Sequence, residues 1–469
     1  MVGRTEEQET LKALLHSSES ELVTVIGRRR VGKTYLIRQC YAKEIVFELT
    51  GIQDATLDEQ LGNFIFALKY HFKDIDQEQA RPSSWLEAFE MLIYSLDKTK
   101  TKKKKVIFID ELPWFDTARS GFMKGLSFFW NSWASKKNIV LATCGSAASW
   151  MIQKVILNKG GLHNRVTKQI ALQPFTLSES QKYLKSRGIK LDYYQMAQLY
   201  MIIGGIPYYL KQVTKGKSVP QITSELLFKK NAILRNEFDN LYQSLFSNYE
   251  KYIAIVEACY SKWKGITHTE LIEITGLPSG GSLTRMINDL VVSGFLKQSH
   301  PYKKKKKEAL IRLVDEFSIF YLKYKRHSKV ANWQAVSKSQ SYKSWLGFAF
   351  ENLCHNHIDE IKRALGISGI TTTQYSLYQS TKGKNTGTQI DLIIDRNDEV
   401  IHICEAKFYN TEFIISKSYQ AQLQNKIEVL RSQIPSSKVV HLTAITTFGV
   451  KENIHSDIVN QNITLKDLF

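Results

Sequence analysis

Eight consecutive residues near the start of the chain combine glycines, a lysine and a threonine at fixed spacing. Residues 27–34 read Gly-Arg-Arg-Arg-Val-Gly-Lys-Thr, which fits the phosphate-binding pattern G-x-x-x-x-G-K-[ST] at every fixed position. Glycines let the backbone wrap closely around phosphate oxygens at the start of a helix. Lys33 is expected to reach the β- and γ-phosphates of ATP, and the Thr34 hydroxyl to ligate Mg²⁺. An ordinary glycine-rich turn is the alternative. The residues expected to hold the nucleotide here are Gly27, Arg30, Gly32, Lys33 and Thr34.

A second chemical group follows about seventy residues later, where the apolar stretch 106–109 ends in Asp110 and Glu111. Asp110 is expected to hold the Mg²⁺ ion through water, and Glu111 to orient the water that attacks the γ-phosphate. An apolar strand ending in acids is a weak signal by itself. After a phosphate-binding loop, it predicts hydrolysis of ATP rather than binding alone.

Two further polar residues are candidates for the same site. Ser146 follows the apolar stretch 139–144 and is placed to sense the γ-phosphate or its water, although it is equally suited to cap the helix that begins near Ala147. Arg165 is a candidate arginine finger or sensor that neutralises charge on the γ-phosphate; a surface arginine is the alternative. If Arg165 acts on a neighbouring copy, hydrolysis requires a homo-oligomer.

Near the end of the chain, acids and a lysine recur on a predicted β-hairpin. Asp391 lies in one strand-like segment and Glu405 in the next, with residues 395–398 as the turn. Adjacent strands would bring both carboxylates to one divalent cation such as Mg²⁺. Lys407 projects to the same face as Glu405, because alternate residues of a strand share a face. Two oxygen ligands and an ammonium group that positions water suit phosphodiester cleavage.

The elements that carry these residues indicate an α/β protein. Short apolar strands at 21–26, 45–49, 106–111 and 139–144 alternate with helical patterns, which predicts a mostly parallel sheet covered on both faces. From 178 to 238 the pattern is helical and is broken by Gly-Gly-Ile-Pro at 204–207. This turn suits a lid that closes over the adenine, and Pro207 is assigned to the nucleotide site on that basis.

Residues 246–330 have the order of a winged helix. Helical spacing at 252–263, 269–275 and 282–295 precedes a strand-like pair at 295–298 and 309–314, which brackets five lysines at 303–307. Lysines at a hairpin tip are suited to phosphate contacts. A wing used for packing or protein contact is the alternative. Residues 331–340 read as a polar linker, and a separate α/β segment is expected to begin near Trp345.

Composition and charge bound the protein class. The 469 residues have a net charge of +19. Residues 241–340 carry 16 Lys and Arg against 8 Asp and Glu, whereas residues 341–469 carry 13 of each. Contact with nucleic acid, DNA before RNA, is therefore sought first in the winged-helix region. The five isolated cysteines suggest no zinc site or disulfide framework, and no apolar run suits a membrane span, so a cytoplasmic protein is expected.

Six motifs occur in a telling order: Gly3-Arg4, the arginine-rich loop, Asp110-Glu111, Gly145-Ser146, Arg165 before Pro174-Phe175, and the turn at 204–207. Over roughly residues 1–330 they resemble the archaeal-type P-loop ATPases of the AAA/STAND assemblage. That family associates the Gly-Gly-x-Pro turn with a nucleotide-sensing lid, followed by a winged helix. The C-terminal segment resembles the PD-(D/E)XK restriction-endonuclease-like fold, which implies Asp391, Glu405 and Lys407 as its central motif and Glu351 as its helical acid.

The resulting expectation is a P-loop ATPase core at 1–175, a helical lid at 176–245, a winged helix at 246–330 and a nuclease-like α/β domain at 341–469. The first hypothesis is an ATP-hydrolysing protein that presents DNA to a Mg²⁺-dependent nuclease site. The second is a STAND-like regulatory switch, in which slow nucleotide exchange gates partner binding and the C-terminal domain is a non-catalytic interaction module.

Overall fold

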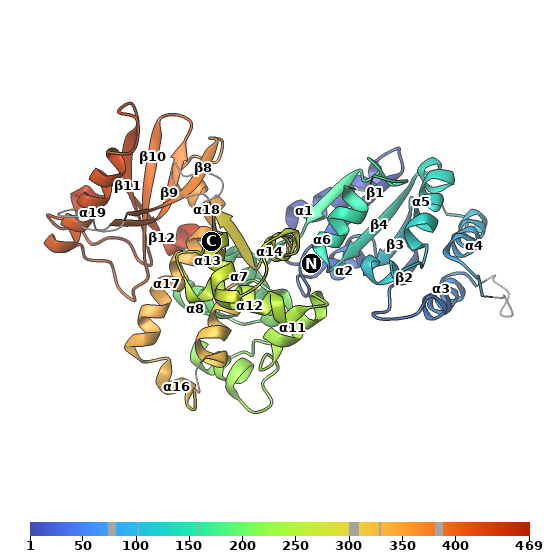
Figure 1. The fold of residues 1–469 in the computed structure, drawn as a ribbon, viewed down its shortest axis with the longest axis horizontal. Coiled ribbons are helices and arrows are strands. Elements are labelled where there is room, and N and C mark those ends of the chain that lie inside the picture. The colour runs from blue at the N-terminus through green and yellow to red at the C-terminus, as the bar shows by residue number, and fades with distance from the viewer. Residues whose placement is uncertain (74–80, 102, 158, 300–308, 328–329, 380–387) are drawn as a thin grey trace. The chain divides into compact units, whose positions relative to one another are not determined.

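The computed structural model describes residues 1–73, 81–101, 103–157, 159–299, 309–327, 330–379 and 388–469. Within it the chain forms two compact units, Met1–Gln173 and Pro174–Phe469. Figure 1 shows a sheet with flanking helices in the first unit, and helices followed by a second sheet in the other. The five lysines at 303–307 lie outside the described residues.

The first unit alternates strands and helices. Its strands are β1 (Glu21–Ile26), β2 (Ile45–Thr50), β3 (Lys105–Asp110), β4 (Ile139–Gly145) and β5 (Lys168–Ala171). Its helices are α1 (Thr5–His16), α2 (Lys33–Cys40), α3 (Leu57–His71), α4 (Trp85–Lys98), α5 (Phe122–Ser132) and α6 (Ala148–Met151). The strands predicted at 21–26, 45–49, 106–111 and 139–144 are therefore confirmed to within a residue or two.

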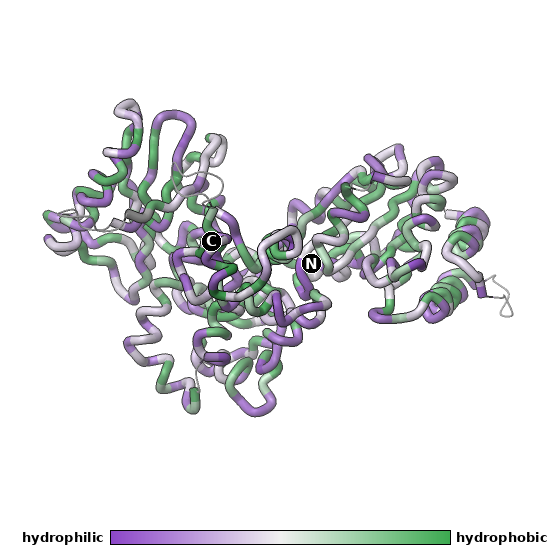
Figure 2. Tube along the Cα trace, in the orientation of Figure 1, coloured by the Kyte–Doolittle hydropathy of each residue, from purple (hydrophilic) through white to green (hydrophobic). Residues whose placement is uncertain are grey.

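These five strands form one parallel sheet in the order β2-β3-β4-β1-β5. Every residue of β4 is buried, and so are all residues of β1 and β3 after the first. Because successive residues of a strand point to opposite faces, burial of all of them means that both faces are covered. Figure 2 shows hydrophobic residues running along these strands. The predicted parallel sheet is confirmed.

Aromatic side chains fill the space between one face of this sheet and α3, α4 and α5. Trp85 lies at the centre of this core, with ring centroids 4.8 Å from Phe122 and 5.3 Å from Phe115. Helix α3 begins with a capping box, in which Thr56 and Glu59 bond each other's backbone amides. Residues of β1, β3 and β4 belong to the same core, so the strands whose ends carry the candidate site residues are packed against these helices.

The second unit begins with helices and ends with a mixed sheet. Its helices are α7 (Leu177–Ser186), α8 (Tyr193–Ile203), α9 (Pro207–Lys211), α10 (Val219–Thr223), α11 (Glu237–Leu245), α12 (Tyr249–Ser261), α13 (His268–Thr275), α14 (Gly281–Val292), α15 (Glu316–Tyr321), α16 (Trp333–Val336), α17 (Gln340–Asn356), α18 (Ile358–Ala364) and α19 (Lys417–Arg431). Its strands are β6 (Leu296–Ser299), β7 (Leu310–Leu313), β8 (Thr372–Gln379), β9 (Thr388–Arg396), β10 (Val400–Lys407), β11 (Val439–Thr446) and β12 (Gln461–Thr464).

The predicted break at 204–207 is a tight turn between α8 and α9. Gly204 ends α8 with φ of 65°, and Pro207 is the first residue of α9. A Cβ added to Gly205 would lie 1.9 Å from the Phe175 carbonyl oxygen, and the Phe175 amide donates to the Gly205 carbonyl at 2.7 Å. Only glycine allows the two backbones to approach this closely.

Helices α12, α13 and α14 are followed by the antiparallel pair β6–β7, in the order predicted for a winged helix. The C-terminal sheet has the order β12-β11-β10-β9-β8, in which β8, β9 and β10 are antiparallel and β10, β11 and β12 are parallel. Strand β6 contacts the edge strand β8. The β6–β7 hairpin is thus packed against the C-terminal sheet.

The prediction of a polar linker at 331–340 is wrong. This stretch contains α16, and Trp333 is only 2% exposed. Its indole stacks on Phe228, with ring centroids 4.9 Å apart, and its ring centroid lies 5.2 Å from that of Phe320, which in turn lies 5.3 Å from that of Trp345. Burial of this one large apolar side chain stabilises the fold by about 3–5 kcal/mol. That gain outweighs the polar composition of the residues around it.

Candidate functional site

The phosphate-binding loop follows β1 and precedes α2, as predicted from its flanking sequence. Its glycines are required by geometry: Gly27 has φ of 151° and Gly32 has φ of 97°. A Cβ on Gly27 would lie 2.4 Å from the Leu172 carbonyl oxygen, at the end of β5. Arg30 also has a positive φ, 72°, so the loop is curved at three of its residues.

Lys33 points into the curve of this loop. Its side chain is 5% exposed, and its ammonium donates to the carbonyls of Gly27 at 2.9 Å and Arg28 at 3.1 Å and to the Ser146 hydroxyl at 3.1 Å. Burial lowers the pKa of Lys33, while the nearby Cys144, Glu111 and Asp110 oppose that shift. The ammonium is available to a phosphate that replaces these neutral acceptors.

Thr34 and Asp110 are brought together from opposite sides of β4. The Thr34 hydroxyl donates to Asp110 Oδ2 at 2.8 Å, and the Glu111 amide donates to Asp110 Oδ1 at 2.9 Å. Burial raises the pKa of Asp110, although these hydrogen bonds oppose the shift. A hydroxyl and a carboxylate side by side are the hard oxygen donors that Mg²⁺ prefers.

Ser146 connects Lys33 to Glu111. Its hydroxyl donates to Glu111 Oε1 at 2.6 Å, and its amide donates to Glu111 Oε2 at 3.0 Å. Helix α6 begins after Ala147 without a side-chain cap, so the Ser146 side chain serves this network rather than the helix terminus. Glu111 and Ser146, which were both predicted from the ends of strands, therefore lie at the phosphate-binding loop.

Sequence reasoning missed two members of this site. Cys144 is one of the five isolated cysteines to which the sequence analysis assigned no role, yet its Sγ donates to Asp110 Oδ1. Burial raises the pKa of the Cys144 thiol well above its usual value, so the thiol keeps the proton that it donates. Pairing β3 with β4 at their carboxyl ends was the signal that could have found it, since Ile109 aligns with Thr143.

Arg4 is the second. Its side chain is 5% exposed, and its Nη2 donates to the carbonyls of Val31, at 3.5 Å, and Gln173. The Gly3-Arg4 motif thus ties the phosphate-binding loop to the chain that follows β5. Only the resemblance hinted at this, because nothing in the local pattern predicts a contact across 169 residues.

Arg165 is not brought to the loop within this unit. It is exposed in the turn before β5, and two residues later the Thr167 amide donates to the Leu22 carbonyl at 2.9 Å. Leu22 is at the start of β1, whereas the loop follows its end. The separation along the strand is roughly 16 Å at about 3.3 Å per residue. Pro207 belongs to the second unit, in the turn described above.

The C-terminal hairpin also has the predicted topology. Strands β9 and β10 are antiparallel with Leu392 aligned with Cys404, so one further step places Asp391 opposite Glu405. Residues directly opposite on adjacent strands share a face. Glu351, on α17, is near enough that burial, Asp391 and Glu405 raise its pKa to about 8 against the opposing effect of Lys407. The four predicted residues therefore share one region.

Glu405 is held by cations and a phenol. Lys407 Nζ lies 3.0 Å from Glu405 Oε1, Lys426 Nζ lies 2.6 Å from Oε2, and the Tyr419 hydroxyl donates to Oε1. Burial alone would raise the pKa of Glu405, but the two ammonium groups outweigh it and bring the pKa to about 2. Sequence reasoning missed Tyr419 and Lys426, whose spacing of seven puts them on one face of α19.

These contacts bear on the predicted metal site at Asp391 and Glu405. In the part of the chain that the structure describes, no group of three or more His, Cys, Asp or Glu side chains is arranged to hold a metal ion. Both Glu405 oxygens are engaged as they stand, so the donor set does not fit a cation without release of Lys426 or Tyr419.

Within the described ranges, no helix combines the length and apolar character needed to cross a membrane.

The loop, Asp110, Glu111 and Ser146 on a parallel sheet define a P-loop nucleotide site. Residues 1–213 match the family model described as an ATPase domain predominantly from Archaea. The N-terminal part of the chain is therefore an ATPase domain of the P-loop type.

Other similarities extend beyond that domain. The uncharacterized protein MJECL04 of Methanocaldococcus jannaschii is 24% identical over 415 residues, covering 87% of each chain. Among solved structures, the Walker-type ATPase PABY2304 of Pyrococcus abyssi is similar with a TM-score of 0.49 at 14% identity, covering 69% of this chain and 96% of that one. The Aeropyrum pernix ORC2 protein has a TM-score of 0.42 at 15% identity, covering 72% and 95%.

Proposed function

We propose that this chain uses ATP hydrolysis to act on DNA, through a winged helix and a C-terminal nuclease-like domain. The observation that carries the ATP part is the convergence of Lys33, Thr34, Asp110, Glu111 and Ser146 on one loop. Lys33 would hold the β- and γ-phosphates, and Thr34 and Asp110 would hold Mg²⁺. When bound, Mg²⁺ neutralises charge on the phosphates.

The residues of this chain supply the remaining chemistry. Glu111 would accept a hydrogen bond from the attacking water, while the hydroxyl and the amide of Ser146 keep its carboxylate oriented. Lys33 would exchange two loop carbonyls for phosphate oxygens, which are stronger acceptors because they are charged. Arg165 would act on the nucleotide of a neighbouring copy in a homo-oligomer, since within its own unit it is far from the loop.

Action on DNA is supported by the charge and by the order of the elements. Residues 241–340 contain twice as many basic as acidic residues, and α12, α13, α14 and the β6–β7 hairpin follow the order of a winged helix. Cleavage is supported by Asp391, Glu405 and Lys407 on one face of the β9–β10 hairpin with Glu351 beside them. Lys407 would position water, and Glu351 would accept or hold a proton.

A second candidate function is the STAND-like regulatory switch with a non-catalytic C-terminal module. The observation in its favour is that Glu405 is already neutralised by Lys407 and Lys426, which gives the hairpin a structural network without a metal. A module of this kind would bind a partner in one nucleotide state and release it in the other.

The testing experiment follows ATP hydrolysis and DNA cleavage in parallel, with Mg²⁺ or Mn²⁺, with and without DNA. Lys33→Ala is expected to abolish hydrolysis, and Lys407→Ala to abolish cleavage while ATP turnover remains. Lys438→Ala is the matched control for the second variant, because Lys438 pairs with Asp395 on the same sheet at 2.5 Å. DNA-stimulated ATP turnover with cleavage supports the first function. Slow, DNA-independent turnover without cleavage favours the switch.

A further inference from the structure

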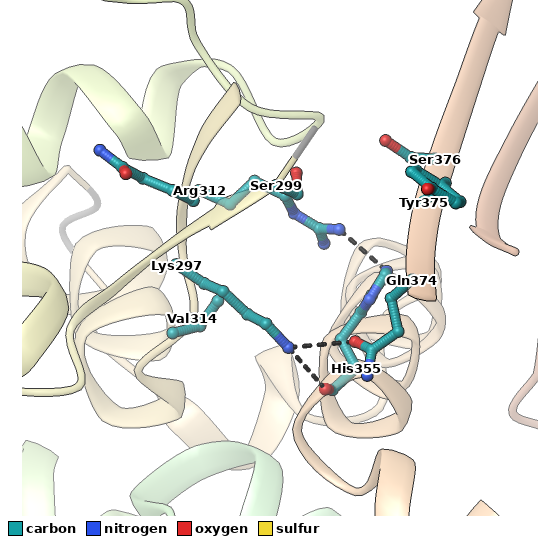
Figure 3. Close-up of a pocket in the computed structure, with 9 residues that line it drawn as sticks. Lys297, Ser299, Arg312, Val314, His355, Gln374, Tyr375 and Ser376 are labelled. Carbon is teal, nitrogen blue, oxygen red and sulfur yellow. Dashed lines mark hydrogen bonds between the residues drawn. The ribbon is translucent and has the colours of Figure 1, made fainter. Parts of the chain in front are cut away.

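A small cavity of about 210 Å³ separates the β6–β7 hairpin from the C-terminal sheet. Figure 3 shows Lys297 and Arg312 reaching into it from the hairpin, with His355 of α17 and Gln374 of β8 on the other side. Ser299 and Ser376 are among the other polar residues that line it. The cavity is smaller than the roughly 300–1,000 Å³ of typical organic-ligand sites, so its size suits an anion rather than a nucleoside.

Among the described residues, the hydrogen-bond partners of the two cations in this cavity are neutral. Lys297 Nζ donates to Gln374 Oε1 at 3.3 Å and to the His355 carbonyl at 3.5 Å, and Arg312 Nη1 donates to His355 Nε2 at 2.9 Å. Burial lowers the pKa of both Lys297 and Arg312, and Asp391 and Glu351 only partly oppose this for Arg312. Two adjacent cations whose nearby carboxylates only partly offset the effect of burial are stabilised by a bound anion.

Unused donors point to the geometry of that anion. Arg312 Nε and Ser299 Oγ are buried, and neither has a hydrogen-bond partner among the described residues. Buried donors of this kind are uncommon in folded proteins. A tetrahedral phosphate offers several charged acceptors in different directions, and arginine binds phosphate through two parallel N–H groups. Nε and Nη of Arg312 therefore form a ready-made fork.

A second cavity adjoins this one and reaches the carboxylate of Asp391. It has a volume of about 590 Å³, shares Arg312 and Ser376 with the first, and is lined further by Asp391, Lys264 and Lys262, the last of which pairs with Glu270 at 2.6 Å. The His355 imidazole, which contacts Arg312, also hydrogen-bonds the Asp391 backbone. A strand anchored by one phosphate at Arg312 would thus have room to run past lysines to the β9–β10 hairpin.

We propose that the cavity between Lys297 and Arg312 binds one phosphate group of a nucleic-acid strand and sets its path toward Asp391. This inference rests on the proposed action on DNA and adds the place where the strand is held. The phosphate is either a strand terminus or an internal phosphodiester, since both present the same charged oxygens. The β6–β7 hairpin then acts as one wall of a binding site shared with the C-terminal sheet.

The test is fluorescence anisotropy of the full chain with labelled single-stranded DNA, in EDTA so that no cleavage occurs. Arg312→Gln and Lys297→Gln are each expected to weaken binding roughly 10-fold or more, as loss of a charged hydrogen bond of about 1.5–3 kcal/mol implies. Each should also reduce the slope of log affinity against log salt by about one. Lys323→Gln is the matched control, because Lys323 is an exposed cation of the same basic region outside the cavity.

Three single-stranded oligonucleotides distinguish the two sources of phosphate. One has a 5′-phosphate, one has a 5′-hydroxyl, and one is closed into a circle and so has no ends. A preference for the 5′-phosphate that Arg312→Gln removes identifies a terminus, and equal binding of the circle identifies the backbone. If wild type binds DNA and both variants match Lys323→Gln, the cavity is not a phosphate site although the proposed function stands. If wild type binds no DNA, the proposed function fails and the inference with it. Thermal unfolding checks the fold, and Lys297→Gln decides the matter if Arg312→Gln does not fold.

Discussion

Replacing Ser146 with alanine removes a hydroxyl that contacts both Lys33 and Glu111. In wild type this hydroxyl donates to Glu111 Oε1 at 2.6 Å and accepts from Lys33 Nζ at 3.1 Å. The variant keeps the amide hydrogen bond to Glu111 Oε2 at 3.0 Å, and Lys33 keeps its two loop carbonyls. Glu111 therefore loses one of two donors that orient it, whereas the loop that binds phosphate is nearly unchanged.

The magnitude follows from the charged partner. A hydrogen bond to an ionised group contributes about 1.5–3 kcal/mol. If Ser146 holds Glu111 in the orientation that the attacking water needs, this energy is lost from the transition state. At about 1.4 kcal/mol per factor of ten, kcat for ATP hydrolysis should fall roughly 10- to 150-fold. KM for ATP should change little, because Lys33 and the loop amides remain in place.

The assay is steady-state release of phosphate from ATP over a range of ATP concentrations. Ser149→Ala is the matched control: its hydroxyl is buried three residues further on and has no hydrogen-bond partner among the described residues, so kcat should be unaffected. The reasoning is refuted if Ser146→Ala leaves kcat at the wild-type value, if Ser149→Ala lowers it equally, or if the loss lies in KM alone.

Three further outcomes are expected. Gly27→Ala should destabilise the first unit by about 1–3 kcal/mol in urea unfolding and weaken ATP binding, because φ of 151° is strained for alanine. Lys426→Met should cost about 3–5 kcal/mol at pH 7 by leaving Glu405 with less charge compensation. That cost should shrink as the pH falls from about 4.5 toward 2, since the lowered pKa of Glu405 stabilises the fold only while the carboxylate is ionised; a pH-independent cost would contradict this. Trp333→Ala should lower stability by about 3–5 kcal/mol in the same measurement, whereas exposed Gln334→Ala should not; equal effects would contradict the buried role of the indole.

The amino-acid sequence by itself determined the local parts of this protein. The loop at 27–34, the strand ending at Asp110 and the turn at 204–207 are each set by residues that are close along the chain. Apolar runs bounded by turns predicted the parallel strands, since a strand buried on both faces must be apolar at every position. The β9–β10 hairpin was also predictable, because its turn and both strands lie within about twenty residues of sequence.

Tertiary structure alone decided which distant side chains meet. Strand order placed β4 between β1 and β3, and so brought Cys144 against Asp110 and Ser146 against both Lys33 and Glu111. Packing also gave the polar stretch 331–340 a helix that buries Trp333. It placed Tyr419 and Lys426 of α19 against Glu405. Contacts between residues far apart in sequence depend on how whole elements pack, and the local pattern that forms each element carries no record of its neighbours.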